Sequence, residues 1–108
     1  MNFSIREAVK NDMQRVHELI TELAVYEKEP DAVITTPDSL ANDGFGENPL
    51  FEFLVAEIEG EILGIALYYY AFSTWKGKSL HLEDLIISKQ YRGKGYGKAL
   101  YNKVMQYA

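Results

Sequence analysis

The residues best suited to chemistry lie in a glycine-rich loop and at the start of the helix expected to follow it. The segment QYRGKGYGKALYNKV begins at Gln90 and alternates three glycines with basic and aromatic side chains. Glycine lets the backbone approach a ligand closely and adopt a positive φ, and the free N–H groups at a helix N-terminus attract anions. We therefore expect a phosphate or pyrophosphate group to bind here. The residues expected to hold it are Arg92, Gly93, Lys94, Gly95, Tyr96, Gly97 and Lys98.

Two other phosphate-binding motifs do not fit this loop. The P-loop pattern G-x-x-x-x-G-K-[ST] is absent from the sequence, and the even spacing of Gly93, Gly95 and Gly97 differs from the dinucleotide fingerprint G-x-G-x-x-G. For the glycines alone, a plain turn that joins a strand to a helix remains the alternative.

An adjacent pair of acids, Glu83 and Asp84, precedes the loop within an apolar strand pattern. Isolated charges are costly to bury, and neighbouring strand residues point to opposite faces, so we expect the two acids to have different roles. Burial beside a second acid would raise the pKa of Glu83 toward the range of a general base. A solvent-facing acid pair at the end of a strand is the alternative.

Other side chains that could do acid–base or metal chemistry are few. His17 and His81 are the only histidines. We expect His17 to pack on or beside the apolar face of the first helix, and His81 to be a weaker candidate base. There are no cysteines, which excludes a disulfide, a thiolate nucleophile and a cysteine–zinc site. We expect no metal ion.

Length and composition predict a single domain over residues 1–108. The chain is 47% hydrophobic and 13% aromatic, which is enough for a packed core. No apolar run reaches the roughly 18 residues that span a bilayer, and the N-terminal segment lacks the layout of a signal peptide. We therefore expect a cytoplasmic protein with no membrane partner.

Charge is divided unevenly along the chain, whose net charge is −5. Sixteen acidic and six basic residues fall within 1–84, whereas 85–108 hold five basic residues and no acid. This asymmetry suggests two faces or two ligands of opposite sign, with a solvated basic helix end as the alternative. The acidic total and the short basic cluster argue against nucleic-acid binding.

The elements that must position these residues are expected in the order β-α-α-β-β-β-α, an α/β or α+β domain. Apolar periodicity, helix caps and turn residues give their bounds. We expect strands at 3–8, 51–58, 62–72 and 80–88, helices from Asn11 or Asp12 to about 27, from Thr36 to about 42 and from about 97, a loop at 43–46, and a hairpin turn at Glu59-Gly60.

The run from Arg92 to Gly97, RGKGYG, resembles the R/Q-x-x-G-x-G/A motif of the GNAT acyltransferase superfamily. Segments along the whole chain, including ELAVYEKEP, DGFGENP and LHLEDLIISKQYRGKGYG, resemble the branch of spermidine/spermine and thialysine acetyltransferases. This resemblance implies a mostly antiparallel sheet flanked by helices, a homodimer, and acetyl-CoA as cosubstrate. In the family the loop and helix cradle the pyrophosphate of acetyl-CoA. The backbone of the preceding strand pairs with the pantetheine arm, and its counterpart here is Leu85, Ile86 and Ile87, with side chains expected in the core.

The same resemblance implies roles for side chains around the acceptor. Glu83 matches the family's general base, which acts through water, and Asp84 matches an acid that helps to hold a cationic substrate. Tyr26 and Glu27 match the acceptor pocket, with an ordinary helix end as the alternative. Trp75 is expected either to line that pocket or to pack.

Two departures from the family pattern matter. Ser73 stands where diamine acetyltransferases usually carry an aspartate two residues before the tryptophan, which weakens the case for a polyamine. Family domains also continue beyond the position of Ala108 through a further strand, a helix and a terminal hairpin. We expect that part, with the tyrosine thought to protonate the departing thiolate, to be missing. An open sheet edge would then favour self-association or lower stability.

The sequence therefore predicts an N-acetyltransferase that moves an acetyl group from acetyl-CoA to a primary amine of a diamine, polyamine or lysine-like amino acid. Direct attack of the amine is expected, because the chain has no cysteine and no visible serine triad. One alternative is a non-catalytic CoA-binding or dimerisation module left by truncation. Another is a protein-interaction domain that uses the strand with Tyr68, Tyr69 and Tyr70.

Overall fold

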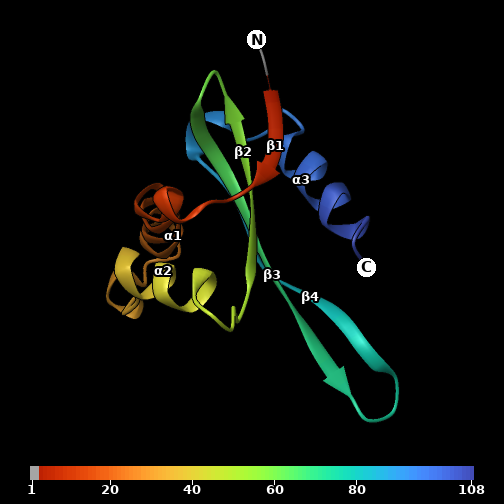
Figure 1. Cartoon of the computed structure of the whole chain (residues 1–108). Helices are drawn as coiled ribbons and strands as arrows, with labels where there is room; N and C mark the ends of the chain where they lie inside the picture. Colours follow the sequence, from red (N-terminus) through yellow and green to blue (C-terminus); the bar gives the residue numbers. More distant parts are fainter. Residues whose placement is uncertain (1–2) are drawn as a thin grey trace.

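A four-stranded antiparallel sheet separates two layers of helices (Figure 1). The structure is a computed structural model and describes residues 3–108. In chain order the elements are β1 (Phe3–Glu7), α1 (Met13–Tyr26), α2 (Pro37–Phe45), β2 (Glu52–Ile58), β3 (Glu61–Ser73), β4 (Gly77–Ile87) and α3 (Tyr96–Met105). Short 3₁₀ turns occupy Lys10–Asp12, Pro30–Ala32 and Lys89–Tyr91.

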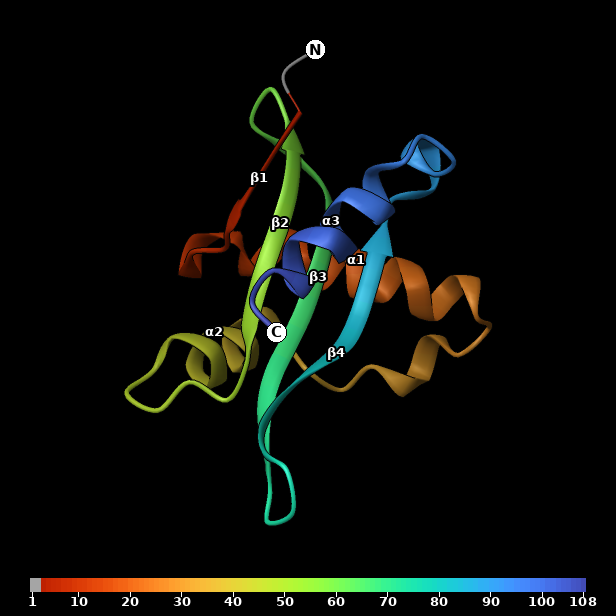
Figure 2. The same ribbon diagram turned by 90° about the vertical axis from the view of Figure 1, so that its right-hand side faces the viewer.

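The sheet has the order β1-β2-β3-β4, and each strand pairs antiparallel with the next. The β2–β3 turn is Glu59-Gly60, whose φ values of 51° and 83° are those of a tight two-residue hairpin turn. The β3–β4 hairpin extends well beyond the helices (Figures 1 and 2). Within residues 3–108, β4 is an edge strand and no further strand lies beside it.

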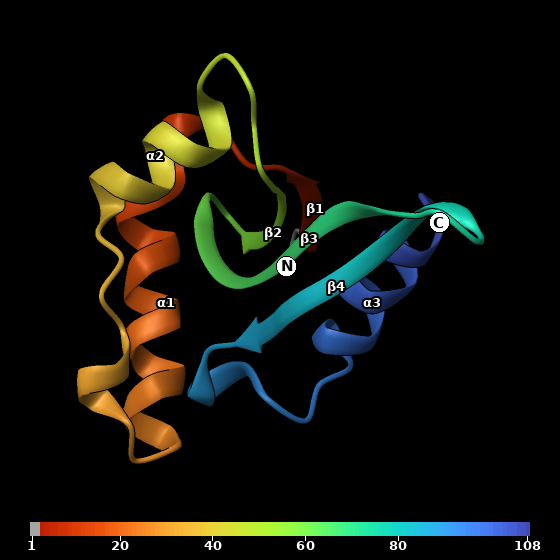
Figure 3. The same ribbon diagram turned by 90° about the horizontal axis from the view of Figure 1, so that it is seen from below.

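Each face of the sheet buries one apolar cluster, because successive strand residues point to opposite faces. The first cluster joins α1 and α2 to the sheet through residues such as Val16, Leu40 and Ile65. The second joins α3 to the opposite face through Leu100 and Val104. Figure 3 shows this layering from below, with α1 and α2 on one side of the strands and α3 on the other.

The predicted element order and sheet type are confirmed. The capping prediction for Thr36 is also confirmed, because Thr36 Oγ1 accepts a bond from Ser39 N at 3.0 Å, and Ser39 Oγ accepts one from Thr36 N at 2.9 Å. Pro37 occupies the first turn of α2, where it costs no helical hydrogen bond. No helix among residues 3–108 is long and apolar enough to cross a membrane.

Asp12 is the N-cap residue of α1, as predicted, but its carboxylate accepts bonds from Arg6 at 2.8 Å and from Val9 N at 2.8 Å instead of from the helix, so it ties the end of β1 to the following turn. One local prediction is wrong. The expected loop at 43–46 is largely helical, because α2 continues to Phe45. Phe45 packs against the first cluster, which extends the helix past its turn-forming residues.

Candidate functional site

The glycine-rich loop joins the end of β4 to the start of α3. Gly93 and Gly95 adopt φ values of 80° and 86°, a left-handed conformation that side chains with a Cβ rarely adopt. The first hydrogen bond of α3 runs from Ala99 N to Gly95 O at 3.1 Å. The N–H groups of Tyr96, Gly97 and Lys98 precede it and carry the positive end of the helix dipole. The loop therefore has the geometry of an anion site.

Aromatic rings fix this loop on the rest of the fold. Tyr96 stacks on Phe3 of β1 with ring centroids 4.6 Å apart, and Tyr91 lies 6.4 Å from Tyr96. Both tyrosines pack against the second apolar cluster. The ammonium of Lys94 lies 5.8 Å from the centre of the Tyr91 ring, and Lys98 is exposed. Tyr96 thus offers its backbone to a ligand, while the two lysines offer their side chains.

Arg92 faces α1, which lies against the opposite face of the sheet from α3. Its Nε donates to Ile87 O at 2.8 Å, and its guanidinium lies 4.9 Å from the centre of the Tyr26 ring. Its Nη2 lies 3.9 Å from Glu22 Oε2. These contacts bring the end of α1 to the loop. Figure 3 shows that the end of β4 also lies beside α1. A hollow of about 170 Å³ lies between them, lined by Glu22, Val25, Tyr26, Lys89 and Arg92.

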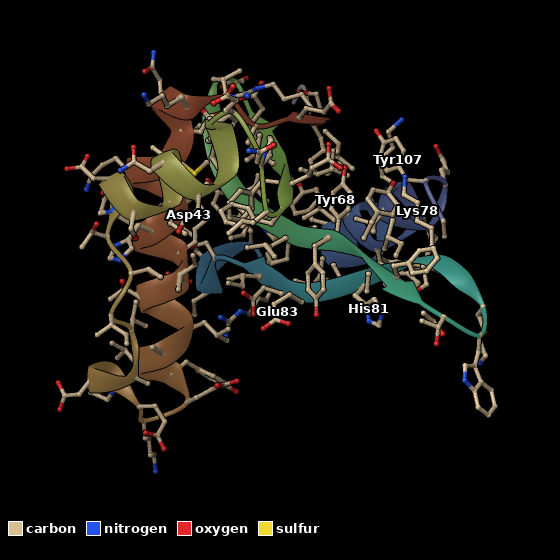
Figure 4. The ribbon with its side chains drawn as sticks, turned by 60° about the horizontal axis from the view of Figure 1, so that its bottom comes forward. Asp43, Tyr68, Lys78, His81, Glu83 and Tyr107 are labelled. Atoms are coloured by element: carbon tan, nitrogen blue, oxygen red, sulfur yellow. The ribbon has the colours of Figure 1, made fainter. Side chains whose placement is uncertain are left out.

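The acid pair lies at a β-bulge in β4. Leu67 pairs with Asp84, but the next residue, Tyr68, pairs with Leu82, so Glu83 is the additional residue in β4. Glu83 is exposed, and Figure 4 shows its side chain along β4, the edge strand of the described sheet. Glu83 therefore faces solvent, as the alternative for the acid pair stated, and burial does not act on it. The sequence prediction assumed strict alternation along this strand. The bulge interrupts that alternation and turns the Glu83 side chain out to solvent.

Asp84 is the half-buried member of the pair. It pairs with Leu67, which packs on the face covered by α1 and α2. Burial raises the pKa of Asp84 above its ordinary value, and the negative charges of Glu83 and Glu27 raise it further. Glu27 directly follows the last residue of α1, Tyr26. The structure thus places Glu27, Glu83 and Asp84 near enough for their charges to interact, and Tyr26 directly precedes Glu27.

Trp75 lies apart from this group. It sits at the tip of the β3–β4 hairpin and is 94% exposed, so the expectation that it packs is wrong. The nearby Ser73 Oγ accepts bonds from Trp75 N at 3.1 Å and Lys76 N at 3.2 Å, so the hydroxyl shapes the hairpin turn. The described residues do not place Trp75 beside the acids.

The segment expected to pair with an extended ligand lies at the end of β4. Ile86 belongs to the first cluster and Ile87 packs against the second, whereas Leu85 is 39% exposed. The expectation that all three side chains are core is therefore wrong for Leu85. On its outer side the backbone of β4 is open within residues 3–108.

The histidines lie on two different elements. Half-buried His17 contacts the carbonyl of Thr35 through Nε2 at 2.6 Å, in agreement with a packed or edge role. His81 pairs with Tyr69, and their rings stack with centroids 5.5 Å apart (Figure 4). Residues 3–108 contain no group of three or more histidine or carboxylate side chains that could hold a metal ion.

A comparison with family models identifies the chain. The model described as "Acetyltransferase (GNAT) family" matches residues 9–108. The chain belongs to this family. The match includes α1, the acid pair and the glycine-rich loop.

Curated relatives agree with this assignment. Thialysine N-epsilon-acetyltransferase of Bos taurus is 44% identical over 112 residues, which include 96% of this chain and 66% of the relative. Spermidine/spermine N(1)-acetyltransferase-like protein 1 of Homo sapiens is 38% identical over 113 residues, which include 98% of this chain and 16% of the relative. The chain thus spans slightly less than two thirds of the thialysine relative and a smaller part of the other.

Solved structures share the fold. A ribosomal-protein-alanine N-acetyltransferase from Brucella melitensis superposes with a TM-score of 0.79 at 20% identity, covering 100% of this chain and 72% of that one. A possible acetyltransferase from Clostridium difficile gives a TM-score of 0.77 at 23% identity, covering 99% of this chain and 71% of that one. The arrangement of β4, loop and α3 is thus part of a GNAT fold.

Proposed function

We propose that this chain binds acetyl-CoA and transfers its acetyl group to a primary amine of a small molecule. The observation that carries the proposal is the glycine-rich loop between β4 and α3 in a chain of the GNAT family. The names of the curated relatives favour a lysine-like amino acid such as thialysine, with a diamine or polyamine as further candidates. Ser73 stands where diamine acetyltransferases usually carry an aspartate, which favours the amino acid.

The residues present fit the pyrophosphate of acetyl-CoA. Two exposed glycines with positive φ leave the loop backbone bare, and the N–H groups of Tyr96, Gly97 and Lys98 form the N-terminus of a ten-residue helix. Lys94 and Lys98 would add positive charge. The open backbone of Leu85, Ile86 and Ile87 would pair with the pantetheine arm as an added strand does.

The acid pair and the end of α1 would serve the amine. A free alkylamine is protonated near neutral pH, because its pKa is about 10. Glu83 is exposed at the bulge, where it can take this proton through water. Asp84 and Glu27 would attract the cation beside the Tyr26 ring, and we keep Trp75 as a further candidate contact.

Bound acetyl-CoA would supply the thioester: the amine nitrogen would bond to the acetyl carbon and give up one proton, the carbon–sulfur bond would break, and the thiolate of CoA would leave and take up a proton as free thiol. Backbone N–H groups of the open β4 edge would polarise the thioester carbonyl. No residue is assigned here as the acid that protonates the thiolate.

The first test is calorimetric titration with acetyl-CoA of three alanine variants. Gly95→Ala and Gly60→Ala place a Cβ in open space at φ values of 86° and 83°, so each should lose about 1–2 kcal/mol of stability from backbone strain. Gly97→Ala lacks this strain, because its Cβ meets Ile87 Cγ1 at an ordinary 3.5 Å, and it tests whether a Cβ at the start of α3 hinders the ligand. We expect weakened binding for Gly95→Ala and unchanged binding for Gly60→Ala. Equal affinities for Gly95→Ala and Gly60→Ala would contradict the proposed site.

Turnover is tested by the release of free CoA thiol in the presence of thialysine, lysine or spermidine. Thiol release that Glu83→Gln abolishes, with acetyl-CoA affinity unchanged, is the result expected for a general base. Binding without turnover for every amine would favour the non-catalytic CoA-binding module. No binding at all by folded protein would overturn the proposal.

We take residues 1–108 as part of one GNAT domain that acts in the cytoplasm and forms a homodimer. Support for association comes from the open edge of β4 within the described residues and from exposed Phe72 and Leu85. Sedimentation velocity at two protein concentrations tests it, and a concentration-independent monomer would contradict it.

A further inference from the structure

Glu22 in the last half of α1 reaches across to the segment that leads into the glycine-rich loop. Its Oε1 accepts a bond from Ser88 Oγ at 3.2 Å, and its Oε2 accepts one from Lys89 N at 3.3 Å. The same Oε2 lies 3.9 Å from Arg92 Nη2. One carboxylate on α1 thus contacts three residues of a five-residue turn that is 66 residues away in the sequence.

This turn, Ser88–Arg92, determines where the loop begins. Ser88 is 6% exposed, and its N–H donates to Leu63 O of β3 at 2.8 Å, so its backbone is tied to the sheet. Lys89 opens the short 3₁₀ turn, whose first N–H groups have no partner within the turn itself. Glu22 supplies an acceptor to one of those N–H groups. A carboxylate that accepts a hydrogen bond from a backbone N–H at such a position satisfies this donor and fixes its orientation.

Arg92 closes the same turn from its other end. Its Nε donates to Ile87 O, five residues earlier, and its guanidinium covers the Tyr26 ring. An exposed ion pair at 3.9 Å contributes little by itself. The geometry is therefore defined mainly by the bonds of Glu22 to Ser88 and Lys89 and of Arg92 to Ile87. Gly93 follows directly, so any shift of Arg92 shifts the bare backbone of the loop.

We propose that Glu22 is a positioning residue for the cofactor loop: together with Arg92 it holds the turn Ser88–Arg92 against α1 and thereby sets where the loop presents its N–H groups. The inference rests on the proposed function, because it takes the loop to be the acetyl-CoA site. In this proposal the Arg92 side chain acts on the loop through its contacts with Tyr26 and Glu22 of α1. It also joins the acceptor end of α1, at Tyr26, to the cofactor side of the site.

The test compares Glu22→Ala, Glu22→Gln and the control Glu18→Ala in the full chain. Glu18 lies one turn earlier on α1 and pairs with Arg15, away from the loop, so its replacement removes a similar charge. Amide hydrogen exchange of Lys89 is measured without ligand, and the dissociation constant for acetyl-CoA by calorimetry. Urea unfolding of each variant shows whether the fold is kept.

For Glu22→Ala we expect the Lys89 amide to exchange about tenfold faster, because its acceptor is gone. The dissociation constant for acetyl-CoA should rise about fivefold through loss of preorganisation. Glu22→Gln keeps one neutral oxygen acceptor and should restore most of both values, a rescue that general destabilisation of α1 would not give. Glu18→Ala should match the wild type.

Unchanged Lys89 exchange in Glu22→Ala overturns the proposal, and so does an equal effect of Glu18→Ala. If Glu22→Ala does not fold, the test rests on Glu22→Gln, in which the Lys89 amide must still exchange slowly. If the wild type binds no acetyl-CoA, the proposed function fails. The exchange data alone then show whether Glu22 positions the turn.

Discussion

At the scale of single residues, two aspartates illustrate how local contacts set protonation in opposite directions. A hydrogen bond from Arg6 lowers the pKa of Asp12, and the Val9 amide acts in the same direction. Burial raises the pKa of Asp84, with added repulsion from Glu83 and Glu27. The first aspartate stabilises the fold as an anion, whereas the second is disfavoured as an anion unless a cation joins it. Only Asp84 therefore suits a site for an ammonium group.

Replacing Asp84 by Asn should stabilise the free protein at neutral pH. The folded state holds the proton of Asp84 more tightly than the unfolded state, so this residue favours folding at low pH, and its contribution is lost as pH rises through the raised pKa. We expect Asp84→Asn to gain up to about 1 kcal/mol at pH near 7, because solvent screens the half-exposed carboxylate. Urea unfolding at about pH 4 and pH 7 measures it. The gain should shrink at the lower pH.

Asp12→Asn is the matched control, with the opposite pH dependence. Its folded-state pKa is lowered, so its stabilising effect is present above the ordinary pKa and is lost on acidification. The variant should lose about 1.5 kcal/mol near neutral pH, the low end of the usual range for hydrogen bonds to a charged group. Its deficit should remain at about pH 4 and shrink only as the pH falls below the ordinary pKa of 3.8. Parallel pH profiles for Asp12→Asn and Asp84→Asn would contradict both assignments.

At the scale of elements, close packing between β3, β4 and α3 supports the loop. A Cβ on Gly64 of β3 would lie 2.5 Å from Ile87 Cδ1, 3.0 Å from the backbone oxygen of Ile86 and 3.4 Å from Leu100 Cδ1. The isoleucine tip can rotate, but the strand oxygen cannot move without shifting β4. Gly64 therefore lets β4 and α3 approach as closely as they do.

Gly64→Ala should destabilise the protein by about 1–3 kcal/mol, the usual range for overpacking a core. Since the clash involves the end of β4, acetyl-CoA affinity should also fall. Urea unfolding and calorimetry measure the two effects. Gly97→Ala is the control for stability, because its Cβ makes only an ordinary contact with Ile87. Wild-type stability for Gly64→Ala would show that the strands separate more easily than this packing implies.

The elements and the glycine loop could be predicted from periodicity, caps and turn residues, whereas the bulge in β4 was missed. Its signal is present in the sequence. Leu80 and Leu82 are spaced by two, but the next apolar residue on the α3 face is Leu85, three positions on. That change of phase requires one additional residue, here Glu83. The exposure of Trp75 could not be predicted, because an aromatic residue near a hairpin tip gives no periodic signal of its burial.

At the scale of the whole molecule, contacts between layers were beyond sequence reasoning. The motif located Arg92 in the chain, but its contacts with Glu22 and Tyr26 depend on how α1 packs across the end of β4. Neither partner carries a spacing signal that points to the loop. The fold assembles the end of α1, the acid pair and the loop from three separate stretches of chain, and only tertiary packing brings them together.

The uneven charge of the chain should make cofactor binding depend on salt. Glu27, Glu83 and Asp84 form an acidic group, while Lys94 and Lys98 lie exposed at the loop. The two lysines attract an anionic cofactor over a screening distance that falls from about 10 Å at 0.1 M salt to about 3 Å at 1 M. We expect the dissociation constant for acetyl-CoA to rise by about tenfold over this range, as measured by calorimetry.

The double variant Lys94→Ala/Lys98→Ala should bind acetyl-CoA more weakly at low salt and respond less to added salt. Lys76→Ala/Lys78→Ala makes the same change in net charge on the β3–β4 hairpin, distant from the loop. If attraction comes from the local loop charge, only the first variant changes the salt response. Equal responses would mean that net charge, rather than the basic start of α3, draws the cofactor to this molecule.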